Sequence, residues 1–424
     1  MLAIRKLFPF SISIFLLLPG VAFCQQVLTW DQVREKFETA NPTLKAADLN
    51  VQESRANEIT AYLRPNPSFA FSTDGTQLLP HQGTWVPLLG TQYSPNLSYL
   101  HERQHKRELR RESAQKATNI ARSQYTDQDR TLTFTLRSAF VMVLQQKAVL
   151  ALSKANMDYY DHVLDISREQ FRVGGIAKVD LDRLELQRVQ YESDLEGARV
   201  GLLDAKIQLL QLLNDHSLPE QFDVTGPFDF ADHIAPRDEY RAMALETRPD
   251  LKAAIQAVDK AKTDHQLAIA NGSTDPTFDL WTTYNPSFNN PFDKNTIGGS
   301  VSIPLRIFDR NQGEKARTLL DIRLNERLRD AAEAQVYNDV DSAYANVESN
   351  IVLLHPYKEK YLSQAVRVRD TMTYSYQRGQ ASLLDFLNAE NDYRSVQRNY
   401  LTLIGAYLTA AAQLNEAVGR EALP

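Results

Sequence analysis

The spacing of apolar residues along the chain changes from a helical period to an alternating period and back, and this change occurs twice. After the turn at residues 171–180, mostly apolar side chains recur three and four residues apart in alternation from Leu181 to Leu212. The same spacing follows the turn at residues 376–385 and continues to Leu414. An average spacing of 3.5 residues keeps one face of a helix against a partner helix and indicates left-handed supercoiling. Each turn therefore lies within a predicted hairpin of long helices.

The two arms of the first predicted hairpin differ in length. About 70 residues, from His101 to Phe171, have a helical pattern, which corresponds to roughly 105 Å at 1.5 Å per residue. The return arm ends near residue 213 and is about half as long. The helical stretches at residues 42–64 and 249–271 have suitable lengths to cover the rest of the long arms. The core of a soluble bundle would show the same spacing of apolar residues. These apolar rows, or seams, therefore do not identify the assembly on their own.

Strands are expected only between these helices, where apolar and polar residues alternate. The predicted strands span residues 67–73, 91–100, 276–284 and 297–307. Pro95 and Pro304 are expected near strand ends, because proline cannot donate a hydrogen bond to a sheet ladder. Four strands cannot close a barrel, and an open sheet edge cannot face lipid. The strands therefore either form a small soluble sheet or are pooled with those of other chains.

The order of elements is repeated because the sequence itself is duplicated. The stretch NPTLKAA at residues 41–47 resembles RPDLKAA at residues 248–254. Around the two turns the matching residues are separated by 205 positions: Phe171 with Tyr376, Gly174 with Gly379, Asp180 with Asp385, and Glu185 with Glu390. We divide the chain into a signal peptide (1–24), a first repeat (25–213), a linker segment (214–247), a second repeat (248–418) and a tail (419–424).

The N-terminal residues have the composition of a secretory signal peptide. Arg5 and Lys6 precede a short apolar core, and cleavage is expected before Gln25, so the mature chain is expected to be exported. Cys24 is the single cysteine of the sequence. A lipid anchor on Cys24 is the alternative to ordinary cleavage, but a lipidation site favours a small residue where this chain has Phe23.

Composition and charge restrict the functions further. The chain has 424 residues, 43% of them hydrophobic, and a net charge of −6 with Lys and Arg spread throughout, so no nucleic-acid partner is expected. Beyond the signal peptide no apolar run reaches the roughly 18 to 20 residues that a spanning helix needs, so membrane insertion would have to use strands. No phosphate-binding loop or nucleophile elbow is present, and we expect neither an enzyme nor a cofactor.

The signal peptide, the duplicated order of elements and the turn signature aromatic-x-x-Gly-x5-Asp together resemble the TolC-type outer-membrane efflux family. The resemblance covers essentially the whole mature chain. It implies a mainly α fold with a β-barrel part: three chains each give four strands to a twelve-stranded outer-membrane barrel, and the helical hairpins form a periplasmic tunnel. It further implies a homotrimer with loops 74–90 and 285–296 outside the cell. A periplasmic adaptor protein and an inner-membrane pump would be its partners.

The resemblance assigns roles to residues of the two turns. The adaptor-docking tips would comprise Gly174, Gly175, Ile176, Gly379, Gln380 and Ala381, where glycine permits left-handed geometry and close approach. A plain helix-to-helix turn that binds nothing is the alternative interpretation.

The gate of the tunnel would comprise Asp180, Asp385 and Asn388. Three copies of Asp385 would form a carboxylate ring that favours cations. Asn388 stands where the family often has a second acidic residue, which would weaken this ring. Helix capping or a favourable interaction with the helix dipole is the alternative role for either aspartate.

Two other functional classes compete with this interpretation. His101-Glu102-x-x-His105 matches the zinc-peptidase pattern, which on a helix would place two imidazoles on one face. Its context is unfavourable, because it directly follows a predicted strand and its repeat counterpart is Asp309-Arg310-Asn311-Gln312-Gly313. We therefore expect no metal site. A periplasmic coiled-coil adaptor is the other class, but such proteins normally carry one long hairpin per chain.

Overall fold

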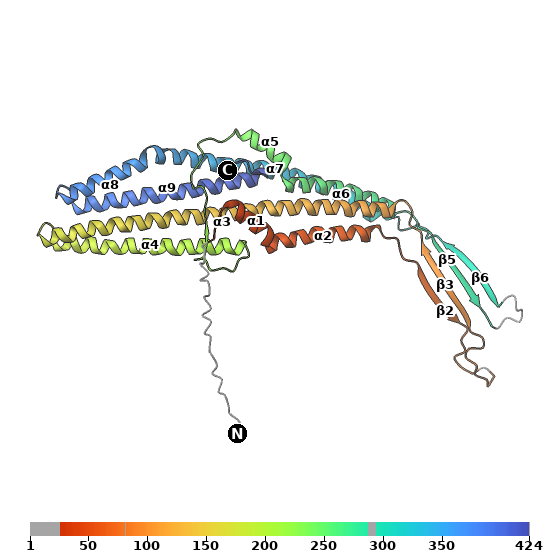
Figure 1. Cartoon of the computed structure of the whole chain (residues 1–424). Helices are drawn as coiled ribbons and strands as arrows, with labels where there is room; N and C mark the ends of the chain where they lie inside the picture. The colour runs from red at the N-terminus through yellow and green to blue at the C-terminus, as the bar shows by residue number, and fades with distance from the viewer. Residues whose placement is uncertain (1–25, 81, 287–293, 424) are drawn as a thin grey trace, which may run out of the picture.

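The computed structural model describes residues 26–80, 82–286 and 294–423. The expected signal peptide, Cys24 and residues 287–293 of the second loop lie outside the described residues. The described chain is an elongated array of helices with a small sheet at one end, and both hairpin turns lie at the other end (Figure 1). None of its described helices is apolar over a length that could cross a membrane.

The long helix α3 (Lys106–Arg172) is the spine of the first repeat. Its half nearer the turn pairs with α4 (Lys178–Leu212), and its half nearer the sheet packs against α2 (Pro42–Tyr62) (Figure 1). The prediction that residues 42–64 cover the rest of the long arm is therefore confirmed. The alternating seam is buried between α3 and α4 because apolar side chains at this spacing share one helical face.

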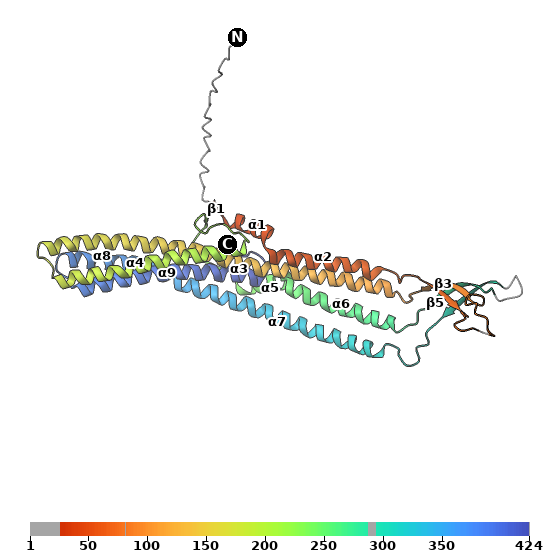
Figure 2. The same cartoon turned by 90° about the horizontal axis from the view of Figure 1, so that it is seen from below.

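The second repeat has the same order of elements. Helix α6 (Pro249–Asn271) lies along α7 (Gln312–Pro356), and α8 (Leu362–Gln377) pairs with α9 (Leu383–Val418) (Figure 2). The two repeats also contact each other directly, through α3 with α6 and α3 with α9.

The long arm of the second repeat is interrupted, unlike that of the first. Between α7 and α8 the chain forms a π-helical turn at Tyr357–Tyr361. Pro356 precedes it and supplies the cause, since proline has no N–H to donate within a helix and its ring displaces the preceding turn. The arm therefore consists of two helices joined at a local irregularity.

The segment expected as a linker, residues 214–247, is structured. Strand β4 (Phe222–Val224) pairs in parallel with β1 (Gln26–Leu28). Helix α5 (Arg237–Thr247) packs on α7 and α9, and α1 (Trp30–Ala40) contacts α3. These elements are short and lack the long periodic pattern of the hairpins, so the sequence did not indicate them.

The four remaining strands form one antiparallel sheet in the order β2-β3-β5-β6. The strands are β2 (Ser68–Asp74), β3 (Gln92–Leu100), β5 (Thr277–Tyr284) and β6 (Asn295–Ser302). The central pair β3 and β5 joins the two repeats. Both edges, β2 and β6, are without a neighbouring strand among the described residues.

The strand register separates apolar from polar side chains. Directly opposite residues share a face, and one face collects Phe69, Phe71, Tyr93, Leu97, Tyr99, Phe278, Leu280, Tyr284, Ile297 and Val301. The other face carries mainly small polar side chains, including Ser68, Ser72, Ser94, Asn96, Ser98, Asp279, Thr283, Thr296 and Ser300. No described element covers the apolar face, and Phe69 is 71% and Ile297 78% exposed.

Two expectations about the strands are wrong. Pro95 lies inside β3, opposite Phe71, rather than near a strand end. The register between β3 and β5 skips Ser94 and Pro95, and the missing N–H of Pro95 interrupts that ladder locally. Strand β6 ends at Ser302 instead of residue 307, because β5 offers no partner beyond Thr277 and Pro304 cannot donate.

Candidate functional site

Both hairpin turns lie side by side at the end of the molecule away from the sheet (Figures 1 and 2). Each turn ends its first helix with a glycine in the left-handed region, Gly174 at φ +78° and Gly379 at φ +70°. A side chain at these positions would be strained, since only glycine adopts this region without a steric cost. The repeated glycine is therefore required by helix termination.

The backbone hydrogen bonds of the two turns are equivalent. Gly174 donates to the carbonyl of Phe171 at 3.0 Å, and Gly175 donates to that of Gln170 at 2.7 Å. In the second turn Gly379 donates to Tyr376 at 2.9 Å and Gln380 to Ser375 at 2.8 Å. This pair of bonds is the Schellman motif, which satisfies the last carbonyls of a helix.

The six expected docking residues differ in exposure. Gly174, Gly175, Gly379 and Gln380 are exposed. Ile176 and Ala381 are half-buried, and their side chains pack inward. They contact a group of buried residues that we call the tip cluster: Met157, Tyr160, Val163, Leu164, Leu181, Leu184, Tyr191, Tyr376, Leu383 and Phe386. Of these six residues, three of the four exposed ones are glycines, which offer only backbone to a partner.

Stacked aromatic rings fix the tip cluster. The rings of Tyr160 and Tyr191 stack with centroids 4.3 Å apart, and those of Tyr376 and Phe386 stack at 5.1 Å. The hydroxyl of Tyr160 donates to the backbone carbonyl of Leu184 at 2.9 Å. Each stacked pair joins the two arms of one hairpin, so the cluster holds both turns in place.

Asp385 is part of a capping box at the start of α9. The N–H of Asp385 donates to Ser382 Oγ at 3.2 Å, and the N–H of Ser382 donates to the Asp385 carboxylate at 3.3 Å. Such reciprocal bonds satisfy two backbone donors at a helix start. Asp385 and Asn388 are both exposed and lie one turn apart. The carboxylate thus caps its own helix and still faces solvent.

Asp180 occupies the equivalent place in α4 but has different surroundings. Ala177 precedes this helix and has no side-chain oxygen, so no capping box forms. Asp180 is half-buried. Burial raises the pKa of Tyr376, and the negative charge of Asp180 raises it further. Because Tyr376 belongs to α8, Asp180 of the first hairpin lies close to the second hairpin.

Polar contacts tie the two hairpins together near the tips. Gln170 Nε2 donates to the carbonyl of Gln377 at 2.9 Å. The hydroxyls of Tyr159 and Thr373 are 2.9 Å apart. Further from the turns, Arg394 of α9 pairs with Asp194 of α4 at 3.1 Å.

Glu390 is a residue of this site that sequence reasoning missed. Its repeat counterpart Glu185 is partly exposed and pairs with Arg168 at 3.3 Å. Glu390, in contrast, is only 3% exposed. Burial raises its pKa to about 7, against the opposing effects of Arg369 and Arg394. Glu185 follows the seam residue Leu184 just as Glu390 follows Ala389, so no local sequence signal separates the two.

The peptidase pattern does not form a metal site. Helix α3 begins at Lys106, so His101 and His105 do not lie on one helical face. Glu102, the would-be general base, accepts a hydrogen bond from Arg110 at 2.8 Å. Within the described part of the chain, no three His, Cys, Asp or Glu side chains are placed to hold a metal ion.

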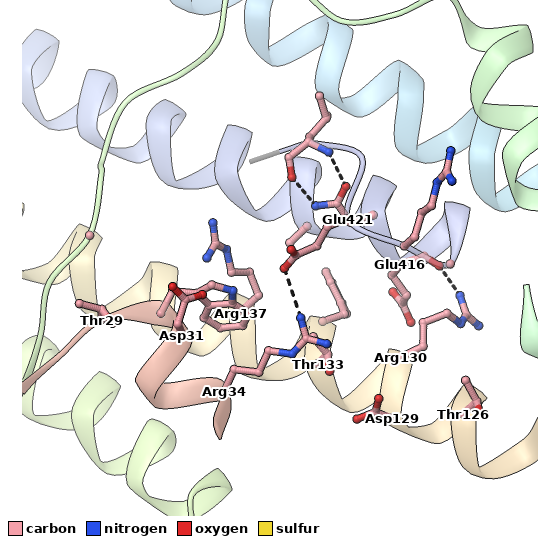
Figure 3. A pocket seen from close by; sticks show the side chains of 18 of the residues that line it. Thr29, Asp31, Arg34, Thr126, Asp129, Arg130, Thr133, Arg137, Glu416 and Glu421 are labelled. Carbon is pink, nitrogen blue, oxygen red and sulfur yellow. Dashed lines mark hydrogen bonds and ion pairs between the residues drawn. The ribbon is translucent and has the colours of Figure 1, made fainter. Parts of the chain in front are cut away.

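A cavity of about 770 Å³ lies at mid-length, between α1, α3, α9 and the C-terminal tail. Arg34 reaches Glu421 at 3.6 Å, and Arg130 donates to the carbonyl of Glu416 (Figure 3). Arg137 stacks on the ring of Trp30 at 4.5 Å, and burial lowers the pKa of its guanidinium. Four arginines and four acidic residues line the cavity, so their charges balance and favour no ligand of either sign.

The sequence matches the outer membrane efflux protein family over residues 33–215 and 241–420, so that each repeat is matched once. The chain belongs to this family. It is an outer membrane protein whose helical part lies in the periplasm.

Individual relatives agree with this assignment. The outer membrane protein TolC of Escherichia coli is 23% identical over 446 residues, which cover 97% of this chain and 87% of TolC. The cobalt-zinc-cadmium resistance protein CzcC of Cupriavidus metallidurans is 23% identical over 284 residues. That alignment covers 66% of this chain and 65% of CzcC, which is less than two thirds of the relative. The crystal structure of CusC has the same fold, with a TM-score of 0.78, 16% identity and 96% coverage of both chains.

Proposed function

We propose that the chain is one subunit of a homotrimeric exit channel in the outer membrane, serving a tripartite efflux or secretion system. The observation that carries this proposal is the four-stranded sheet. It has one apolar face, one polar face and two free edges, and it extends beyond the helices of a single chain. An open edge cannot face lipid, so the sheet requires copies of itself.

Pooling strands from three chains would give a closed barrel of twelve. The apolar face would contact outer-membrane lipid, and the polar face would line the pore, as in barrels of this kind.

Exposed apolar side chains on two of the long helices also suit packing against the helices of neighbouring chains. Exposed apolar residues run along α4 at Val179, Leu186, Val200 and Ile207. A second exposed row lies on α7 at Leu320, Leu324 and Leu328. Rows of this kind favour contact with neighbouring chains.

The helical end would then be the periplasmic end of the tunnel. Three chains present six turns, and the exposed backbone at Gly174, Gly175, Gly379 and Gln380 would meet a ring of adaptor hairpins. An inner-membrane transporter would supply the energy, and this chain would act as a passive conduit that catalyses no reaction. Asp385 would form the charged ring of the gate, with Asn388 and Asp180 beside it.

Native mass spectrometry of the mature protein in detergent, together with conductance in planar bilayers, tests this proposal. We expect a complex of three chains that begin at Gln25, and discrete channels in the bilayer. Added acyl mass on Cys24 would keep the channel but change the expected cleavage site. A monomer in the soluble fraction would contradict the pooled barrel and favour a periplasmic adaptor.

A further inference from the structure

Glu390 is buried at the place where the two hairpins meet. The groups that interact electrostatically with it come from all four hairpin helices: Tyr159 and Tyr160 of α3, Tyr191 of α4, Arg369 and Asp370 of α8, and Arg394 of α9. The tip cluster lies next to this group and includes Tyr160, Tyr191 and Tyr376. Separation of the hairpins would therefore expose Glu390 to water.

The two nearby cations do not neutralise Glu390 directly. Arg394 pairs with Asp194 at 3.1 Å and lies over the ring of Tyr191 at 4.3 Å. Arg369 pairs with Asp370 at 2.8 Å and lies over the rings of Tyr159 and Tyr393. No ion pair within 4 Å forms on Glu390 among the described residues. A hydrogen bond with the Tyr159 side chain lowers the pKa of Glu390 and the charge of Asp370 raises it, so an ionised carboxylate here is compensated only in part.

Polar atoms around Glu390 also lack hydrogen-bond partners. One Glu390 carboxylate oxygen, Arg394 Nε and the hydroxyls of Tyr191 and Tyr376 are buried without a hydrogen-bond partner in the described structure. An unsatisfied buried polar group costs about 1–3 kcal/mol, and more when it is charged. Protonation of Glu390 removes the part of this cost that comes from its buried charge.

We propose that Glu390 is a proton-controlled positioning residue, which keeps the hairpin tips packed together when protonated and favours their separation when ionised. This inference rests on the proposed channel function, because it assigns the regulation of the same tips.

The direction of the pH dependence follows from the two states. The pKa of Glu390 is about 7 in the packed state and returns toward its ordinary value of 4.5 when water reaches it. Below pH 4.5, Glu390 is protonated in both states and contributes its full stabilisation to the packed tips. This stabilisation declines as the pH rises from 4.5 to about 7, and it is lost above about pH 7. Each unit of difference changes the ratio of packed to separated tips by about tenfold, so we expect a change of at least about tenfold.

The test compares the full-length protein with E390Q and with the matched control E185Q, which alters the partly exposed repeat counterpart. Hydrogen–deuterium exchange at the tips is measured at several values between pH 5 and pH 8.5, with variants compared at equal pH. We expect wild type and E185Q to lose protection at the tips as the pH rises. E390Q should retain its protection, and E390D, which still titrates, should follow wild type.

Single-channel conductance over the same pH range separates this inference from the channel function. If no variant conducts, the proposed function fails, while the exchange data still test Glu390. If the channels conduct and tip protection in E390Q falls with rising pH as it does in wild type, the proposal about Glu390 is overturned. A misfolded E390Q would leave the comparison of E390D with wild type, where loss of the pH course in a folded protein also overturns it.

Discussion

The side-chain amide of Gln170 lies 2.9 Å from the backbone carbonyl of Gln377, to which it donates a hydrogen bond. Gln170 lies in the last turn of α3 and Gln377 is the last residue of α8, so this bond connects the two hairpins at their tips. It joins residues that are 207 positions apart in the sequence. The first hairpin thus supplies the donor side chain of this bond, and the second supplies the acceptor carbonyl.

Gln170→Ala should therefore loosen the tips without unfolding the chain. The loss of one partly buried hydrogen bond costs about 1 kcal/mol, and we expect faster exchange of the amides around both turns. Gln52→Ala is a suitable control, because Gln52 donates to Asp48 on its own helix α2, away from the turns. Equal exchange in both variants would contradict a connecting role for Gln170.

The charge and the capping role of Asp385 can be separated by two substitutions. Asp385→Asn removes the charge, and we expect lower cation selectivity and weaker block by multivalent cations, because charged rings select ions in pores. Ser382→Ala removes the cap, which costs about 1 kcal/mol of stability, but it keeps the carboxylate. Block that is unchanged in Asp385→Asn, or lost equally in Ser382→Ala, would count against a gate at Asp385.

Alanine at Gly174 or Gly379 should destabilise the corresponding turn by roughly 1 kcal/mol, because both residues have φ near +70° to +78°. No neighbouring atom lies within 4 Å of a Cβ built at either position, so backbone strain alone should set this cost. Gly197 lies within α4 and is equally open. Gly197→Ala should instead stabilise its helix by a similar amount. Thermal unfolding of the three variants provides the measurement, and the same sign for all of them would disprove this explanation.

The hairpins and strand pairs could be predicted from the sequence because their signals are local and periodic. The alternating spacing of three and four residues around Leu181 and Leu184 predicts which face of the helix is buried, whichever helix packs against it. Other features depend on tertiary contacts: Glu185 and Glu390 occupy the same repeat position, yet only Glu390 is enclosed by the neighbouring hairpin. Strand β6 ends at Ser302 because β5 offers no partner beyond Thr277, which the residues of β6 could not indicate, whereas Pro304 was a local signal for an end before residue 307.

The two faces of the sheet give the sharpest test of membrane insertion. Leu97 lies on the apolar face between Phe69 and Leu280, whereas Ser98 lies on the polar face between Ser68 and Asp279. Arginine on the lipid face of a barrel costs about 2–4 kcal/mol near the bilayer midplane, whereas a pore-facing residue can be charged.

We therefore expect Leu97→Arg to reduce the amount of trimer recovered from outer membranes several-fold. Ser98→Arg should assemble at nearly the wild-type level and alter ion selectivity. Native mass spectrometry of detergent extracts measures the first effect, and reversal potentials in planar bilayers measure the second. Normal assembly of Leu97→Arg together with failure of Ser98→Arg would mean that the sheet is oriented in the opposite sense, with its aromatic face toward the pore.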